Sequence, residues 1–220
     1  MKLPTIIVNF KTYGSATGER ALLLAKIHER VVMETGVSIA IAVQPTDIAL
    51  LASEVKIPVF AQHIDAIEYG AHTGYILAEA ARAAGAYGTL LNHAEHQIED
   101  GVLRKSIEAA KRAGLYTVVC ANTPERGAEI VKYGPDLVAV EPPDLIGGDV
   151  SVSTAEPEII KNAVKLIGEG KVLVGAGVRT AEDIKIALAL GAQGVLLASG
   201  VTKAMYPEKV LRELAAAINP

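Results

Sequence analysis

The chain has 220 residues, of which 50% are hydrophobic, 21% are charged and 4% are aromatic, with one cysteine and a net charge of −4. An acidic balance without a Lys/Arg-dense run argues against a nucleic-acid or membrane-surface binder. One cysteine excludes an internal disulfide and favours the reducing cytosol. Polar Asn9 and Lys11 come too early for a signal peptide, and no stretch approaches the ~18 apolar residues of a membrane helix. We expect a cytoplasmic globular protein.

Short apolar runs alternate along the chain with longer stretches of helical spacing. Runs rich in Val and Ile predict strands at residues 5–8, 38–43, 59–62, 88–92, 116–120, 137–140, 171–174 and 194–197. Apolar residues at helical spacing predict helices at residues 18–34, 100–113, 180–190 and 207–218. The strand runs are continuous rather than alternating, which is typical of parallel strands covered on both faces. Residues 63–75 carry little pattern and are expected to form a loop.

Eight alternating units admit two α/β architectures, a closed (β/α)8 barrel or an open doubly wound sheet. No GxGxxG sequence follows the first strand, so the usual dinucleotide fingerprint of the open sheet is absent. No linker or break in composition divides the chain. Polar and glycine-rich residues gather just after strands, which is where barrel active sites lie. We therefore predict one compact TIM-barrel domain over residues 1–220.

Five strand ends carry the residues that could perform chemistry. In chain order they are Asn9 and Lys11, then Asn92-His93-Ala94-Glu95, then Glu141-Pro142-Pro143, then Gly175-Ala176-Gly177, and last Ala198-Ser199-Gly200. In a barrel these ends meet at one mouth, where an ammonium, an imidazole and a carboxylate would come together. The glycine-rich turns after the seventh and eighth strands predict a phosphate cradle, because backbone N–H groups are accessible there.

These motifs resemble those of the triosephosphate isomerase family, in its shorter archaeal form. The residues that carry the resemblance are Asn9-x-Lys11, Asn92-His93-x-Glu95, Glu141-Pro142-Pro143-x-x-Ile146-Gly147, and Gly175-x-Gly177 with Ala198-Ser199. They cover nearly the whole chain in the family's order. The resemblance implies interconversion of dihydroxyacetone phosphate and D-glyceraldehyde 3-phosphate through an enediolate, in glycolysis and gluconeogenesis, without a cofactor or a metal.

Residue chemistry and the resemblance together suggest a role for each group. Glu141 is the acidic residue at a strand end with a mobile-looking loop behind it, so it is the candidate base. By resemblance, His93 is a neutral electrophile and Lys11 supplies positive charge, with Glu95 as its expected partner. Asn9 is expected to donate an amide hydrogen to the substrate. The phosphate is expected to lie against Ile146, Gly147, Gly175, Gly177, Ala198 and Ser199.

Two other functions remain open from the residues alone. The cradle would also suit another phosphate-binding barrel isomerase or synthase, similar to phosphoribosylanthranilate isomerase, or a non-catalytic phosphometabolite-binding protein. Ala94 and Asp149 depart from the family pattern, and they are the support for the non-catalytic alternative. Cys120 is expected to be a buried core thiol. We expect a phosphorylated triose as substrate, no nucleic-acid or membrane partner, and a homo-oligomer, with a tetramer favoured and a dimer possible.

Overall fold

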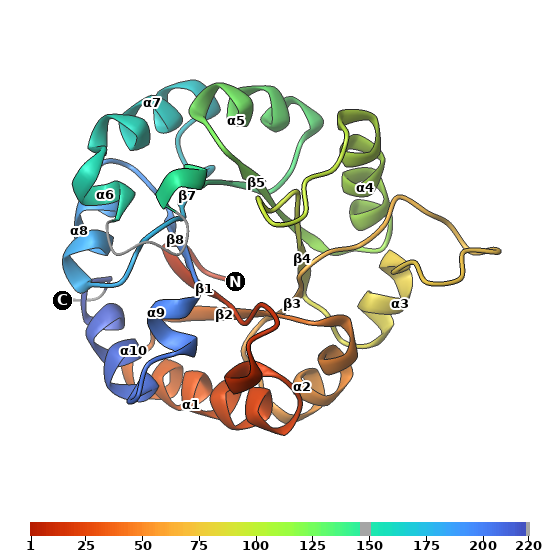
Figure 1. Cartoon of the computed structure of the whole chain (residues 1–220), viewed down its shortest axis with the longest axis horizontal. Helices are drawn as coiled ribbons and strands as arrows, with labels where there is room; N and C mark the ends of the chain where they lie inside the picture. Colours follow the sequence, from red (N-terminus) through yellow and green to blue (C-terminus); the bar gives the residue numbers. More distant parts are fainter. Residues whose placement is uncertain (146–150, 219–220) are drawn as a thin grey trace.

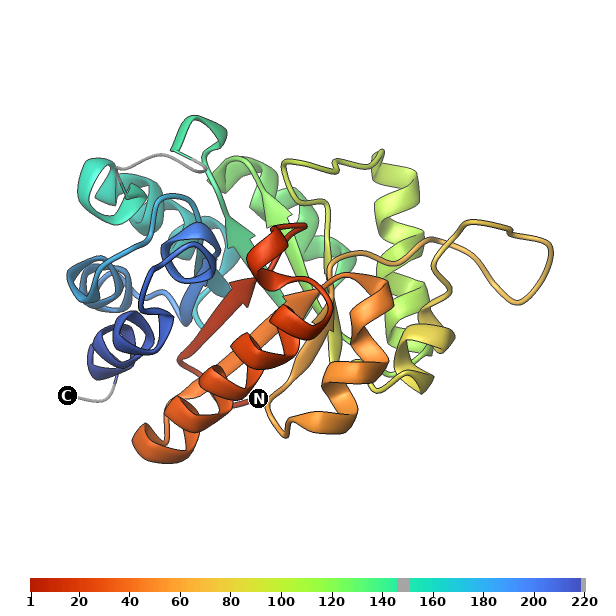
Figure 2. The same cartoon turned by 60° about the horizontal axis from the view of Figure 1, so that its bottom comes forward.

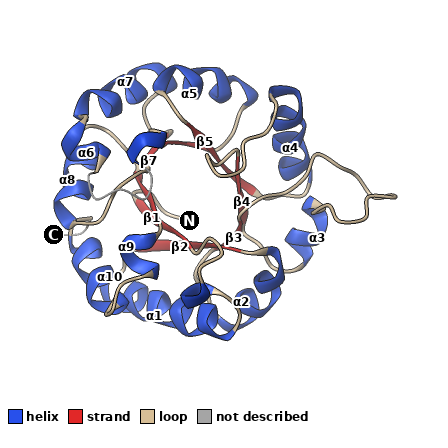
Figure 3. Ribbon diagram, in the orientation of Figure 1, coloured by secondary structure: helices blue, strands red, loops and turns tan. Residues whose placement is uncertain are grey.

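The computed structural model describes residues 1–145 and 151–218, and within them eight parallel strands form one closed barrel (Figures 1 and 3). Each strand pairs with the next strand in the sequence, and the last pairs with the first, Thr5 opposite Gly194. The predicted TIM barrel is therefore confirmed, and the open sheet is excluded, because an open sheet leaves two edge strands without a partner.

The eight strands lie within two residues of the predicted runs. Their bounds are β1 Thr5–Asn9, β2 Ser38–Val43, β3 Val59–Ala61, β4 Gly88–Leu91, β5 Tyr116–Ala121, β6 Leu137–Val140, β7 Val172–Val174 and β8 Gly194–Leu197. The α-helices surround the strands, as Figure 1 shows. Their bounds are α1 Glu19–Thr35, α2 Ile48–Glu54, α3 Ala78–Ala83, α4 Asp100–Arg112, α5 Pro124–Ile130, α6 Val152–Ala155, α7 Pro157–Ile167, α8 Ala181–Ala189, α9 Ser199–Thr202 and α10 Pro207–Ala216.

Local sequence explains where several helices begin and end. Thr180 caps α8 by accepting from the backbone N–H of Asp183, and the Asp183 side chain returns the contact, so the capping box is complete. Gly134 ends the turn after α5 in a left-handed conformation. The sequence prediction omits α7. It also omits the five helices of at most seven residues, which are too short to show a helical period: α2, α3, α5, α6 and α9. No helix in the described residues is long and apolar enough to cross a membrane.

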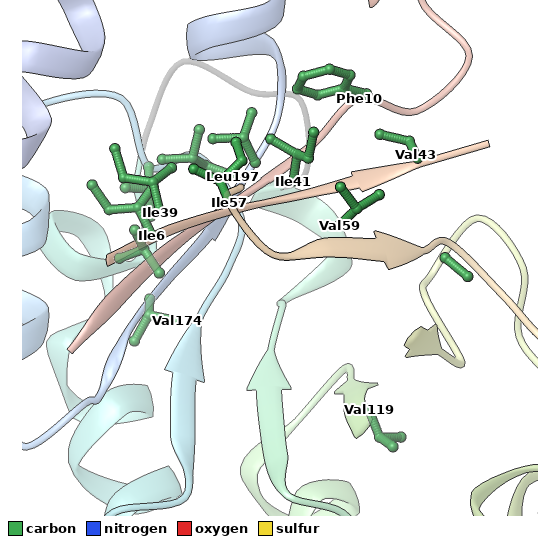
Figure 4. Packing of buried hydrophobic residues seen from close by; sticks show 14 of the residues in the cluster. Ile6, Phe10, Ile39, Ile41, Val43, Ile57, Val59, Val119, Val174 and Leu197 are labelled. Carbon is green, nitrogen blue, oxygen red and sulfur yellow. The ribbon is translucent and has the colours of Figure 1, made fainter. Parts of the chain in front are cut away.

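The core has two layers because neighbouring residues of a strand point to opposite faces. The inner layer fills the barrel with Ile7, Ala40, Ala42, Phe60, Leu90, Val118, Cys120, Leu137, Ala139, Leu173 and Leu196. The outer layer lies between strands and helices and includes Ile6, Ile39 and Val174, which Figure 4 shows. Cys120 is buried, as predicted. A filled barrel leaves room for a ligand only at its ends.

The loop of residues 62–77 between β3 and α3 projects away from the barrel (Figure 2) and contains no helix or strand. The loop predicted at residues 63–75 is thus confirmed.

A buried histidine in α1 makes the stability of the fold depend on pH. His28 is fully buried beside the Phe10 ring, with 5.4 Å between the ring centroids. Its Nδ1–H donates to the Leu24 carbonyl (2.7 Å), while its buried Nε2 has no partner in the described residues. Burial lowers the pKa of His28 to about 4, against the opposing effect of the Leu24 contact. The folded state therefore favours the neutral imidazole.

We expect the free energy of unfolding to fall by about 3 kcal/mol as the pH drops from 7 to 4, because each pKa unit is worth about 1.4 kcal/mol. The unfolded chain takes up a proton near pH 6.5 that the folded chain refuses until about pH 4. Urea unfolding of wild type and His28→Leu across this range measures the effect. In His28→Leu the free energy of unfolding should fall less between pH 7 and 4 than in wild type. The control His72→Leu, at an exposed histidine, should show the same fall as wild type. Parallel curves for all three proteins would contradict the assignment.

Candidate active site

A cavity opens at the carboxyl ends of the strands, as barrel geometry predicts. It holds about 480 Å³ of space not filled by protein atoms, including the open solvent at its mouth. The described residues that line it are Asn9, Lys11, Tyr13, His93, Glu141, Ala176, Gly177, Val178, Arg179, Leu196, Leu197, Ala198, Ser199 and Gly200. The groups that follow β1, β4, β6, β7 and β8 therefore meet in one place.

Glu141 follows β6 directly and its carboxylate enters the cavity. Its backbone N–H donates to the Ala121 carbonyl (2.9 Å), so the strand pairing continues as far as Glu141. The residue is 4% exposed, and its Oε2 atom is buried without a hydrogen-bond partner in the described residues. A buried carboxylate oxygen without a hydrogen-bond partner is costly, and such a group in a cavity indicates a functional role.

His93 faces Glu141 across the cavity. Its Nε2 atom lies 3.8 Å from Glu141 Oε2, and its side chain is 10% exposed. The Nδ1 atom accepts the backbone N–H of Glu95 (3.1 Å), so Nδ1 carries no proton. The proton of the neutral ring must then be on Nε2, the nitrogen nearer the carboxylate. This contact places an N–H donor, rather than a lone pair, toward the cavity.

Lys11 supplies the ammonium of the site. Its Nζ donates to Glu95 Oε1 at 2.6 Å, and its side chain is 12% exposed, whereas that of Glu95 is 58% exposed. The expected pairing of Lys11 with Glu95 is confirmed. Asn9, which is 5% exposed, accepts the Lys11 backbone N–H at its Oδ1 atom (3.0 Å). The Oδ1 atom is thus occupied, and the Nδ2 amide is the group of Asn9 that remains for a ligand.

Three residues at the strand ends have a left-handed backbone although none is glycine. They are Lys11 (φ 48°), Asn92 (φ 59°) and Ala176 (φ 68°), which follow β1, β4 and β7. A conformation of this kind costs a non-glycine residue about 1–3 kcal/mol and tends to occur at functional sites. Asn92 is held by its own side chain, whose Nδ2 donates to the Cys120 carbonyl (3.0 Å) and whose Oδ1 accepts from Ile98 N–H (3.1 Å).

The side of the cavity formed by the turns after β7 and β8 is suited to an anion. Within the described residues, the backbone N–H groups of Gly177 and Ser199 donate to no recorded acceptor. Arg179 lines the same side, and its Cγ lies 3.4 Å from where a Cβ on Gly200 would stand. The stem of the Arg179 side chain therefore packs against the turn after β8.

Gly175 packs against the candidate base rather than lining the cavity. A Cβ at this position would lie 2.3 Å from Glu141 Cγ and 2.6 Å from Glu141 Oε1. The φ of Gly175 lies outside the left-handed region, so its backbone admits alanine. The requirement for glycine is therefore the space that the Glu141 side chain occupies.

We expect Gly175→Ala to lower kcat by about 10²-fold, because a displacement of about 1 Å in a reacting group has effects of that size. The fold should persist, since the methyl group pushes a side chain that can turn into the cavity. Steady-state kinetics and urea unfolding separate the two effects. The control is Gly101→Ala in exposed α4, where a Cβ meets only Glu99 Oε1 at 3.5 Å. Retention of more than half of the wild-type kcat in Gly175→Ala would contradict the packing argument.

The structure brings together most of the residues predicted for the site. Seven of them line the cavity: Asn9, Lys11, His93, Glu141, Gly177, Ala198 and Ser199. Gly175 lies behind Glu141, and Ile146, Gly147 and Asp149 lie outside the described residues. Sequence reasoning missed Tyr13 and Arg179. The position of Arg179, two residues beyond Gly177 in the same turn, was a signal that could have identified it.

A pair of histidines lies beside the cavity. The His63 and His96 rings are 4.4 Å apart between centroids, and His63 Nε2 lies 3.3 Å from Asp65 Oδ1. Burial, with the nearby His96 as a smaller cause, lowers the pKa of His63, against the opposing effect of its hydrogen bond to Asp65. Among the described residues, no group of three or more His, Cys, Asp or Glu side chains is arranged to hold a metal ion.

Comparison with known proteins agrees with the geometry. The family model described as "Triosephosphate isomerase" matches residues 4–214. The proteins named triosephosphate isomerase from Methanobacterium bryantii and Methanothermobacter thermautotrophicus are both 49% identical to the chain. The alignments cover 98% and 96% of this chain and 97% and 94% of the relatives. The protein of the same name from Methanocaldococcus jannaschii is 46% identical over 95% of this chain and 97% of its own length.

A crystal structure of triosephosphate isomerase from Bartonella henselae shares the fold. The TM-score is 0.75 at 19% identity, and the match covers 99% of each chain. At 19% identity this similarity shows only that the two proteins share the barrel fold.

Proposed function

The chain belongs to the triosephosphate isomerase family, and we propose that Glu141, His93 and Lys11 perform its aldose–ketose isomerisation. The substrates of that reaction are dihydroxyacetone phosphate and D-glyceraldehyde 3-phosphate. One observation carries the assignment of residues. Glu141 Oε2, which has no hydrogen-bond partner among the described residues, faces the proton-bearing Nε2 of His93 at 3.8 Å, in a cavity that Lys11 also lines.

Isomerisation moves one proton from carbon to the neighbouring carbon. In our proposal the Glu141 carboxylate removes a proton from C1 of dihydroxyacetone phosphate, and the C–H electrons form the enediolate double bond. The resulting Glu141 carboxylic acid returns a proton to C2, which gives the aldehyde. One base suffices because both carbons lie within reach of a single carboxylate, and general base catalysis is worth about 10²–10⁴-fold.

The developing negative charge on the two oxygens requires donors. His93 Nε2–H donates to either oxygen; it gives its proton to one oxygen and takes back the hydroxyl proton of the other. The Glu95 N–H on Nδ1 keeps the ring proton on Nε2, where this exchange occurs. The Lys11 ammonium offsets the charge of the intermediate, and the Asn9 amide adds one neutral donor. Preorganised donors of this kind contribute about 2.7–4 kcal/mol each. We propose that the phosphate binds the backbone N–H groups of Gly177 and Ser199, next to Ala198 and Arg179. Gly175 lies behind Glu141, and the predicted contacts of Ile146 and Gly147 lie outside the described residues.

The activity is tested by incubating the protein with dihydroxyacetone phosphate in heavy water. We expect deuterium at C1 together with turnover in a coupled isomerase assay. Phosphate binding without label or turnover would support the non-catalytic alternative and overturn the proposal. Turnover without label would show that the transferred proton does not exchange with solvent. The loss of turnover in Glu141→Gln would then decide whether Glu141 is the base.

We further propose that the protein is a cytoplasmic homo-oligomer. Exposed apolar side chains support association, among them Met33 (79% exposed), Met205 (83%) and Tyr206 (67%). Burying such side chains in an interface is favourable by about 25 cal/mol per Å². Light scattering coupled to gel filtration measures the mass of the protein in solution. We expect the mass of a tetramer, and the mass of a monomer would contradict the proposal.

A further inference from the structure

The side chain of Gln62 joins the carboxyl ends of three neighbouring strands. Gln62 follows β3, and its backbone N–H donates to the Val43 carbonyl (3.2 Å), which continues the pairing of β3 with β2. Its Nε2 atom lies 2.9 Å from the Lys11 carbonyl, 3.2 Å from Asn9 Oδ1 and 3.3 Å from the Ala42 carbonyl. An amide has two N–H groups, so the Lys11 carbonyl takes the shortest contact and the other two oxygens share the second hydrogen.

Lys11 depends on contacts of this kind because its backbone is left-handed, with φ at 48°. The chain relaxes from such a conformation unless its surroundings hold it. The Lys11 N–H is bound by Asn9, two residues earlier in the same turn. Gln62 supplies the contact to Lys11 O from another strand. The Glu95 contact holds the far end of a flexible side chain and comes from a carboxylate that is 58% exposed, so it cannot fix the backbone.

We propose that Gln62 is a positioning residue, which holds the Lys11 backbone left-handed and thereby aims the ammonium into the cavity. The inference rests on the catalytic role proposed for Lys11. Gln62 acts through hydrogen bonds to Lys11 and Asn9, and both of these residues line the cavity whereas Gln62 does not. Removal of the amide leaves the Lys11 and Ala42 carbonyls without this donor, and the turn is then free to relax.

Kinetics of Gln62 variants provide the first test. Gln62→Leu keeps the approximate shape but removes both hydrogens, and we expect kcat/KM to fall about tenfold. Gln62→Glu is nearly isosteric and places carboxylate oxygens against three acceptors, so a larger fall is expected. The control is Gln44→Leu, because Gln44 lines the neighbouring cavity and its Nε2 donates to Thr17 Oγ1 (3.0 Å). Its kcat/KM should stay within twofold of wild type.

A double-mutant cycle separates positioning from a merely structural role. With Lys11→Met as background, Gln62→Leu should change kcat/KM by less than twofold, because the group that it positions is gone. An equal tenfold fall in both backgrounds would overturn the proposal, and so would an unchanged kcat/KM for Gln62→Leu alone. If Gln62→Leu does not fold, Gln62→Glu takes its place in the same cycle.

Hydrogen exchange tests the clamp without reference to activity. The Lys11 amide should exchange at least tenfold faster in Gln62→Leu than in wild type, while the Val43 amide inside β2 should be unaffected. Unchanged exchange at Lys11 would overturn the clamp. An inactive wild-type protein with the expected exchange would instead overturn the proposed function and leave the clamp standing.

Discussion

Replacing Glu141 with glutamine is expected to lower kcat by about 10³-fold and to change KM by only a few-fold. Glutamine fills the same space, but its amide cannot accept a proton from carbon, so the loss falls within the range of about 10²–10⁴-fold for removal of a general base. The coupled isomerase assay measures kcat and KM, and deuterium incorporation at C1 measures proton removal. Glu141→Asp should also lower kcat far more than affinity, because it withdraws the carboxylate by one methylene.

The control for Glu141→Gln is Glu125→Gln, which removes an exposed carboxylate on α5. It should leave kcat unchanged. A fall of less than tenfold in Glu141→Gln would show that another group is the base. Unfolding of the variant adds an independent check. Glu141 is 4% exposed, and its Oε2 has no partner in the part of the chain that the structure describes, so removing its charge should leave the free energy of unfolding unchanged or raise it.

Replacing His93 with glutamine is expected to lower kcat by about 10²–10³-fold, the effect of removing one preorganised donor. Glutamine retains an N–H, but it cannot give up that proton and regain one, so protons no longer move between the two oxygens of the enediolate. The acceptor for the Glu95 N–H is also lost, which loosens the turn after β4. Steady-state kinetics measure the fall in kcat.

His96→Gln is the matched control for this variant. His96 lies three residues further along the same loop and lines the neighbouring cavity rather than the site. We expect its kcat to remain within twofold of wild type. Equal losses in the two variants would mean that the loop tolerates no substitution, and the role given to His93 would fail.

The cost of this site lies in its backbone and in its buried charge. Lys11, Asn92 and Ala176 adopt left-handed conformations at three different strand ends. Glu141 keeps out of water an oxygen that no group in residues 1–145 or 151–218 hydrogen-bonds. The two layers of the barrel core supply the stability that offsets these costs. Positions outside the cavity, such as Gln62, carry part of that support. Substitutions at such positions should therefore affect catalysis, although the residues replaced do not contact the substrate.

The strands were predictable because each is a short apolar run buried on both faces, a pattern that local sequence shows directly. The runs at residues 38–43, 137–140 and 194–197 coincide with β2, β6 and β8. Short helices such as α3, with six residues, were not predictable one by one, since a period needs more than two turns to appear.

The sequence by itself determined the barrel, the strand ends and the chemical types that stand at them, including Lys11, His93 and Glu141. Only the tertiary structure decided that Gly175 makes room for Glu141 and that the Gln62 amide donates to the Lys11 carbonyl. It also buries His28, whose Nε2 has no partner among the described residues. The physical reason is the range of the interactions. Apolar periodicity is set by neighbours along the chain, whereas these contacts join residues from different βα units, whose separation becomes fixed only when the barrel closes.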